Sequence, residues 1–308
     1  MGGAAIGVPA LINTLVSKRA GKLPAPAWGK GRSYPFKHGE IHYQRLGEGP
    51  PVLLLHSFGP GHSAEEWRPS AELLARSHQV FVPDLLGWGR SGRPKMTYDS
   101  ELYIELIADL VQNLVGSRPS VVAAGLTAAY AVQLAVDRPE LLRALALIVP
   151  SGIELHGDEP DFKDAMVHRL LRLPILGTSA LNVYTSRSAI ANYLGKEVYA
   201  GAERVDEALI DRYYRNSHQP GAHGALAAYL SGYLNHSVRE VLDGVDLPVW
   251  IGWGRQATTP SVESADLWLR QLTGAELEVF ENSGTLPHAE SPEELSRRLE
   301  LFLSSLRD

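Results

Sequence analysis

Chemistry in this 308-residue chain has to come from hydroxyl, imidazole and carboxylate groups, because the sequence contains no cysteine. Disulfides, thiolate zinc sites and cysteine nucleophiles are therefore excluded. His218 and His223 lie on either side of Pro220-Gly221 with no acidic residue nearby, which is not a metal-ligand pattern. No glycine-rich phosphate-binding motif follows a strand pattern either. We expect neither a metal nor a cofactor.

The elements that must position these groups alternate between strands and helices. This alternation predicts an α/β fold, in which a mostly parallel central sheet carries helices on both faces. The expected strands after a hairpin at Tyr34–His38 and Ile41–Arg45 are Val52–Leu55, Val80–Val82, Val121–Ala124, Ala144–Val149, Val249–Trp253 and Glu276–Phe280. The expected helices are Ala64–Arg76, Glu101–Val115, Ala128–Val136, Ser261–Leu272 and Glu293–Leu306.

Residues 152–240 interrupt this alternation, because they contain helical periods and no apolar run typical of a strand. We expect them to form a helical lid inserted into a core of residues 34–151 and 241–308. Ligands of open α/β sheets bind at the carboxyl ends of the strands, so the lid is expected to cover that edge.

Residues 1–33 are predicted to be an apolar N-terminal segment and a linker. The apolar stretch Ala4–Val16 has about 13 residues, whereas a membrane span needs ~20. Its positive charges follow the apolar stretch, which is the reverse of a signal peptide. Lys22–Ser33 is rich in Pro and Gly and is predicted to be the linker. We expect deletion of residues 1–21 to leave the melting temperature nearly unchanged.

Several motifs, in order, match one superfamily. His56–Gly59 is similar to a His-Gly-x-Gly turn, with Trp67 following at a familiar distance. Asp84–Ser91 is similar to a D-x-x-G-x-G-x-S loop, and Pro287–Pro292 resembles the end of a G-H-x-P-H-x-E-x-P segment. Over about Tyr34–Leu306 the chain therefore resembles a capped, esterase- or lipase-like α/β hydrolase.

The resemblance implies a Ser-His-Asp triad, and none of its three positions keeps the required chemistry. The nucleophile stands at a sharp strand-to-helix turn, G-x-S-x-G, where this chain has Gly125. Gly adopts a positive φ easily, so the turn is expected to persist without its hydroxyl. The general base should be a histidine after Gly284, where Thr285 stands, and the acid should lie at Ala257. We predict that the catalytic triad is degenerate.

The groups left around this site define a candidate ligand-binding and oxyanion region. The backbone amides of Phe58 and Leu126 are the expected oxyanion donors. Thr127 is an alternative nucleophile only if the turn is shifted by two residues. His288 corresponds to a histidine with a structural hydrogen-bonding role in many members. The complete expected region consists of Ser57, Phe58, Gly59, Gly125, Leu126, Thr127, Thr285 and His288.

Our leading hypothesis is a non-hydrolytic protein that binds a small hydrophobic molecule or a partner under the lid. One alternative is a hydrolase, or a non-hydrolytic catalyst, that uses a rearranged site with Thr127, Thr285 or His288. A further alternative is a membrane-surface protein that makes a peripheral contact through residues 4–16. The net charge of −6 argues against nucleic acid as a partner. The absence of cysteine fits a cytoplasmic location, with membrane association as the alternative.

Overall fold

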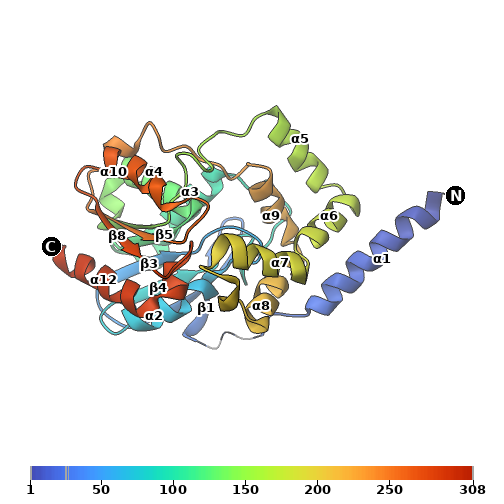
Figure 1. Ribbon diagram of the computed structural model, residues 1–308, viewed down its shortest axis with the longest axis horizontal. Coiled ribbons are helices and arrows are strands. Elements are labelled where there is room, and N and C mark those ends of the chain that lie inside the picture. The colour runs from blue at the N-terminus through green and yellow to red at the C-terminus, as the bar shows by residue number, and fades with distance from the viewer. Residues whose placement is uncertain (1, 25, 27, 307–308) are drawn as a thin grey trace.

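The computed structural model describes residues 2–24, 26 and 28–306, and within them an eight-stranded sheet forms the centre of the molecule (Figure 1). Its order is β1-β2-β4-β3-β5-β6-β7-β8. β1 pairs antiparallel with β2, and β2 antiparallel with β4, whereas all later neighbours are parallel. The predicted α/β fold with a mostly parallel sheet is therefore confirmed.

The strands follow the apolar runs of the sequence closely. Every residue of β5 and β6 is buried, as expected for strands covered on both faces. The strands are β1 (Lys30–Phe36), β2 (Gly39–Leu46), β3 (Pro51–Leu55), β4 (Gln79–Pro83), β5 (Ser120–Ala124), β6 (Ala144–Ile148), β7 (Val249–Gly254) and β8 (Glu276–Phe280).

Helices cover both faces of this sheet, as Figure 1 shows. On one face α3 (Ser100–Asp109) packs on α4 (Leu126–Asp137), with α10 (Ala265–Gln271) beside them. On the other, α2 (Arg68–Leu74) packs against α12 (Pro292–Ser305) and the short α11 (Pro287–Glu290). α2 is shorter than predicted, because a 3₁₀ turn precedes it and Pro69 stands in its first turn.

Between β6 and β7 the chain forms helices and turns and no strand within the described residues. The helices of this helical insertion are α5 (Phe162–Leu171), α6 (Leu176–Tyr184), α7 (Arg187–Tyr193), α8 (Glu207–Ser217) and α9 (His223–Leu230). They lie together on one side of the sheet in Figure 1. A second apolar cluster, around Ile190, Leu194 and Tyr213 of the insertion, also includes Ala20 of α1 and Leu286.

The N-terminal segment differs from its prediction. α1 (Gly2–Ala20) packs against α6, and the Asn13 side chain forms hydrogen bonds with Ile175, Ser179 and Asn182. The deletion prediction assumes a terminus without long-range contacts, and this assumption is wrong, because Asn13 contacts residues at least 162 positions away in the sequence.

The predicted linker is also shorter than expected, since β1 begins at Lys30 rather than near Tyr34. The first residues of β1 are exposed at the edge of the sheet, so their side chains show no apolar pattern in the sequence. Backbone pairing with β2, from Lys30 opposite Arg45 onward, extends the strand instead.

Candidate functional site

The turn after β5 has the geometry of a nucleophile elbow. Gly125 adopts φ 60° and ψ −128°, directly before the first residue of α4. Its N–H donates to the Ile148 carbonyl at 2.9 Å, and its carbonyl accepts from the Ser151 N–H at 3.2 Å, which fixes the turn against β6. The predicted positive φ is confirmed. A residue with a side chain would be strained in this conformation, which Gly125 adopts without a side chain and therefore without a hydroxyl.

The space in front of Gly125 is filled from the opposite loop. A Cβ atom at Gly125 would lie 2.4 Å from the Ser57 Oγ. The Ser57 backbone N–H donates to Glu66 Oε1 at 2.8 Å, which anchors the turn after β3. The Ser57 hydroxyl itself forms no hydrogen bond with the described part of the chain. A free hydroxyl therefore stands beside the empty nucleophile position.

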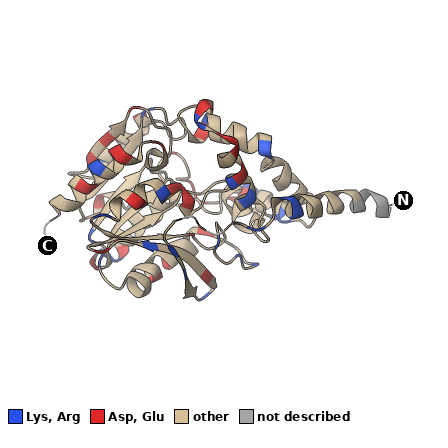
Figure 2. Ribbon diagram, turned by 90° about the horizontal axis from the view of Figure 1, so that it is seen from below, with Lys and Arg blue, Asp and Glu red and all other residues tan. Residues whose placement is uncertain are grey.

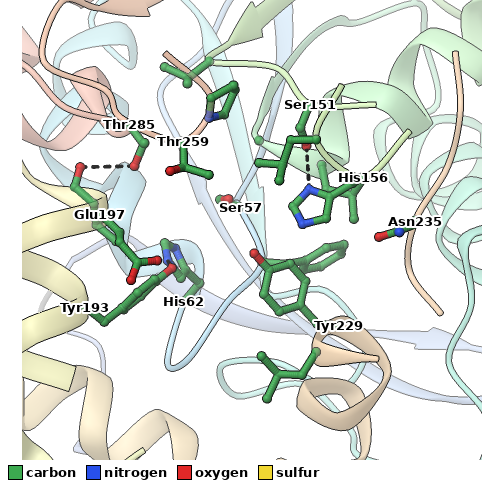
Figure 3. Close-up of a pocket in the computed structure, with 18 of the residues that line it drawn as sticks. Ser57, His62, Ser151, His156, Tyr193, Glu197, Tyr229, Asn235, Thr259 and Thr285 are labelled. Carbon is green, nitrogen blue, oxygen red and sulfur yellow. Dashed lines mark hydrogen bonds between the residues drawn. The ribbon is translucent and has the colours of Figure 1, made fainter. Parts of the chain in front are cut away.

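A cavity of about 430 Å³ opens above this turn, between the sheet and the helical insertion (Figure 3). This volume is within the range of small-molecule pockets. Five residues of the predicted region line it: Ser57, Phe58, Gly125, Leu126 and Thr285. The insertion contributes Leu155, His156, Tyr184, Tyr193, Glu197, Val198, Tyr229, Leu230, Gly232 and Asn235, and the remaining wall consists of His62, Val149, Ser151, Thr259 and Pro260.

Gly59 and Thr127 do not line the cavity, although the sequence places them in the candidate region. Gly59 lies just behind the wall, where an added Cβ would approach the Tyr193 hydroxyl within 2.5 Å. Thr127 is fully buried, and its hydroxyl donates to the Ala124 carbonyl at 2.9 Å, which is a helix-start hydrogen bond. The shifted-turn alternative therefore has no accessible hydroxyl.

The other predicted catalytic positions carry no base and no acid. The Thr285 hydroxyl and N–H both donate to the Val198 carbonyl, at 3.1 and 2.8 Å (Figure 3). Ala257 is buried outside the lining, although its loop pairs with that of Thr285 through a hydrogen bond from the Gln256 N–H to the Ser283 carbonyl. His288 is fully buried and stacks on Trp67 at 3.8 Å between ring centroids.

A buried carboxylate joins two histidines behind the cavity wall. Glu66 Oε2 lies 2.7 Å from His62 Nδ1, and its Oε1 lies 3.3 Å from His288 Nε2. Burial alone would raise the pKa of Glu66, but the charges and hydrogen bonds of the two histidines hold this pKa well below its usual range. Glu66 is therefore a permanent anion at neutral pH.

The same carboxylate orients a histidine that reaches the cavity. With the proton on Nδ1, His62 donates to Glu66 and its Nε2 accepts from the Tyr193 hydroxyl, 2.9 Å away. Burial raises the pKa of Tyr193 well above its ordinary value, so the phenol stays neutral. The Glu66 carboxylate, the His62 imidazole and the Tyr193 hydroxyl therefore form a hydrogen-bonded series, as in a catalytic triad. The last member, Tyr193, lines the cavity.

Sequence reasoning missed this series of three residues. His62 and Glu66 are four residues apart, a spacing that also occurs in ordinary helices. Tyr193 lies in the insertion, 131 residues after His62. Only the packing of α7 on the core therefore reveals the contact between these two residues.

The family comparison agrees with this architecture. A family model described as the alpha/beta hydrolase family matches residues 52–298, from β3 into α12. The chain belongs to the alpha/beta hydrolase family.

Relatives and solved structures cover most of this alpha/beta hydrolase chain. An uncharacterised protein of Mycobacterium tuberculosis is 28% identical and covers 85% of this chain and 78% of its own. The 2-hydroxy-6-oxo-6-(2'-aminophenyl)hexa-2,4-dienoic acid hydrolase of Metapseudomonas resinovorans is 25% identical. The match covers 87% of this chain and 89% of that hydrolase. The structure of the epoxide hydrolase CorEH has a TM-score of 0.74 at 20% identity. The match covers 90% of this chain and 99% of CorEH, which shows the shared fold.

The opposite wall of the cavity of this alpha/beta hydrolase carries a second polar pair. Ser151 Oγ lies 3.1 Å from His156 Nδ1 (Figure 3). Burial lowers the pKa of His156 to about 4, so its imidazole is neutral at pH 7. His156 has a φ of 59°, which is uncommon for a residue other than glycine. The backbone is thus held in a strained conformation where His156 faces the cavity.

Two backbone amides beside the elbow have no acceptor within the described residues. They are the N–H groups of Phe58 and Leu126, the predicted oxyanion donors. Both residues line the cavity. Among the described residues no cluster of three acidic or histidine side chains has the arrangement of a metal site. The polar groups of the lining that can meet a ligand are backbone amides, hydroxyls, imidazoles, the Asn235 carboxamide and the Glu197 carboxylate.

Proposed function

We propose that this chain binds a small amphipathic molecule between the sheet and the helical insertion, without serine-dependent hydrolysis. The observation that carries the proposal is Gly125, which keeps the strained elbow and omits its nucleophile. The insertion acts as the lid of this binding site, because its tyrosines form one wall of the cavity.

The absence of hydrolysis follows from the groups that replace the triad. Acyl transfer needs a nucleophile and a base that takes its proton. Thr285 has no basic nitrogen, and its hydroxyl is engaged with the Val198 carbonyl. The loop around Ala257 offers no carboxylate to orient a base. The elbow and the free amides of Phe58 and Leu126 remain, so the site can still bind an oxygen.

The lining indicates the chemistry of the ligand. Phe58, Leu126, Val149, Leu155 and Leu230 supply apolar surface for a hydrophobic body. The free amides and the Ser57 hydroxyl are suited to a carbonyl or carboxylate oxygen on that body. We therefore infer a largely hydrophobic ligand with one oxygen-bearing polar end.

Two measurements test the proposal on the full chain. A fluorophosphonate probe should leave the protein unlabelled, and p-nitrophenyl butyrate should be hydrolysed no faster than by denatured protein. A fluorescent fatty acid, dansyl-undecanoic acid, should bind and become more fluorescent. Leu155→Trp, which fills the cavity, should weaken this binding at least ~10-fold. Leu301→Trp, at an exposed position far from the cavity, is the matched control.

Labelling of a cavity hydroxyl by the fluorophosphonate would overturn the non-hydrolytic proposal. Mapping the label would then identify the nucleophile, with Ser57 as the first candidate because its hydroxyl stands beside the elbow. Equal loss of probe binding in Leu155→Trp and Leu301→Trp would overturn the binding site.

A second candidate function is proton transfer by a rearranged site, and the contact between His62 and Tyr193 favours it. When His62 is protonated, Tyr193 can give its phenolic proton to a ligand carbon and recover one from His62 Nε2. Glu66 stabilises the imidazolium that this transfer requires. Such a series could ketonise an enol: the ligand carbon gains the proton of Tyr193, the enol hydroxyl releases its own proton to water, and no bond is hydrolysed.

The enol of phenylpyruvate is a simple probe for this chemistry, because its ketonisation is followed by absorbance. We expect acceleration by the wild-type chain and at least ~100-fold loss in Tyr193→Phe, the usual size of general acid–base catalysis. Tyr184→Phe removes another cavity tyrosine that contacts no histidine, and it should retain the activity. No acceleration by the wild-type chain, or equal loss in both variants, would reject this candidate.

A further inference from the structure

Exposed apolar side chains gather on three helices at one end of the molecule. Twelve of the thirteen large hydrophobic residues that are exposed among the described side chains lie on α1, α5, α6 or the turn between α5 and α6. The thirteenth is Leu301, on α12. We call residues 8–20 and 162–184 the apolar end; its exposed hydrophobic members are Val8, Leu11, Ile12, Leu15, Phe162, Met166, Val167, Leu170, Leu173, Leu176, Val183 and Tyr184.

The spacing shows that these residues form faces and are not scattered. On α1 they stand at positions i, i+3, i+4 and i+7, which places them along one side of the helix. On α5 they stand at positions i, i+4, i+5 and i+8 from Phe162, whose side chain is 83% exposed. Such stripes normally face a core, whereas here they face outward.

The three helices belong to one unit. α6 packs against both α1 and α5, and Asn13 ties α1 to α6 and to the turn before it. In Figure 1 these helices project from the sheet at the end that carries the N-terminus. Exposed apolar area of this extent in one place is typical of an interaction surface.

The charge of the apolar end is opposite to that of the rest of the chain. Residues 8–20 and 162–184 contain five basic residues and one acidic residue, Asp164, whereas Asp158, Glu159 and Asp161 directly precede the second range. The whole chain has 29 basic and 35 acidic residues, which leaves 24 basic and 34 acidic residues elsewhere. The net charge is therefore +4 at this end and −10 over the remainder. Figure 2 shows basic residues on α1, and both basic and acidic residues among the helices beside it.

We propose that the apolar end docks on the surface of an anionic lipid bilayer. Apolar stripes flanked by Lys18, Arg19, Arg169 and Arg172 are typical of helices that lie in the membrane interface, where the apolar face enters the bilayer and the cations remain at the headgroups. No helix of the described residues is long and apolar enough to cross a membrane, so the contact is peripheral. The acidic remainder of the chain is repelled by such a surface, which orients the molecule.

The apolar end also reaches the ligand cavity. Tyr184, the last residue of α6, is 44% exposed at this end and also lines the cavity. This continuity deepens the proposed function, on which this step rests: the ligand is a single-chain lipid, with an acyl tail and one polar end, that enters from the bilayer past α6.

Co-sedimentation with vesicles tests the docking surface. We expect the full chain to sediment with vesicles of seven parts phosphatidylcholine to three parts phosphatidylglycerol. Binding should be at least ~10-fold weaker to phosphatidylcholine alone and at about 1 M salt, where the Debye length is short. The pairs Leu11→Ser with Leu15→Ser, and Phe162→Ser with Leu170→Ser, should each weaken binding at least ~10-fold.

Leu301→Ser is the matched control, because it removes an equally exposed leucine outside the apolar end and should bind as the wild type does. No sedimentation of the wild type, or equal effects of Leu301→Ser and the paired changes, would overturn the proposal. A dimer in light scattering that the same pairs dissociate, without vesicle binding, would show that a second copy covers this face instead.

The cavity variant Leu155→Trp separates this inference from the proposed function. It should keep full vesicle binding and lose only the fluorescent fatty acid. If the wild-type chain binds vesicles but not the fluorescent fatty acid, the ligand site is rejected and the docking surface is retained. If it binds the fatty acid but not vesicles, only the docking surface is rejected.

Discussion

Ser57 Oγ occupies the space in which a side chain at Gly125 would begin. The two residues come from different loops, after β3 and β5, and a Cβ at Gly125 would lie 2.4 Å from this oxygen. In the His-Gly-x-Gly turn that His56–Gly59 resembles, position 57 is a glycine and the elbow carries the hydroxyl. In this chain the serine stands at position 57 and the glycine at position 125, so the hydroxyl lies on the loop after β3.

This relationship predicts a measurable coupling between the two positions. Gly125→Ala should destabilise the fold by about 1 kcal/mol from its positive φ, plus a similar cost for displacing the Ser57 hydroxyl. In a Ser57→Ala background the second cost should vanish, which gives a coupling energy of about 1 kcal/mol. Urea unfolding of the four proteins measures it, and strictly additive effects would contradict the contact.

The contact between Ser57 and position 125 also determines the smallest set of substitutions that can produce a serine hydrolase. Gly125→Ser, Ala257→Asp and Thr285→His supply the triad chemistry, but the new serine needs the volume that Ser57 occupies. We expect the quadruple variant that also carries Ser57→Gly to react with a fluorophosphonate at residue 125. The triple variant that retains Ser57 should react at least ~10-fold more slowly. The quadruple variant with alanine at position 285 is the control without a base. Equal labelling with and without Ser57 would refute the idea.

The docking of α1 predicts that one polar side chain stabilises the helical insertion. Asn13→Ala removes hydrogen bonds to Ile175, Ser179 and Asn182 and should cost about 1–2 kcal/mol. Thr14→Ala is the control, because its hydroxyl bonds only to the Ala10 carbonyl within α1. Hydrogen exchange should be faster in α6 of Asn13→Ala than in α6 of Thr14→Ala. Unchanged exchange in both would mean that α1 is not docked in solution.

The pKa of His156 predicts how stability depends on pH. Burial lowers this pKa to about 4, whereas an unfolded chain has a histidine pKa of about 6.5. Between these values the unfolded state binds more protons, so the free energy of unfolding falls as the pH drops from about 6.5 to about 4. His156 alone contributes at most about 1.4 kcal/mol per pH unit.

The variant His156→Asn isolates this contribution, since Asn tolerates the positive φ at this position and does not titrate. Urea unfolding at several pH values should show a shallower loss of stability in His156→Asn than in the wild type. His38→Asn changes an exposed histidine and should keep the wild-type slope. An unchanged slope in His156→Asn would contradict the burial of this imidazole.

The sequence by itself determined the sheet, its parallel pairing and the chemistry missing from three positions. These properties are local: apolar runs such as Val121–Ala124 mark buried strands, and the absence of a hydroxyl at Gly125 or of an imidazole at Thr285 needs no structure to be seen. The start of β1 at Lys30 could not be predicted in the same way, because backbone pairing, and not a side-chain pattern, defines it.

Only the tertiary structure decided what stands around the empty elbow. The contact of Ser57 with Gly125 depends on β3 lying beside β5 in the sheet, although β4 separates them in sequence. The contact of His62 with Tyr193 depends on how the insertion packs onto the core. The outward direction of the stripes on α1 and α5 is decided by what the rest of the chain covers. Periodicity gives the spacing of such residues, but their neighbours are set by packing between segments that are distant in sequence.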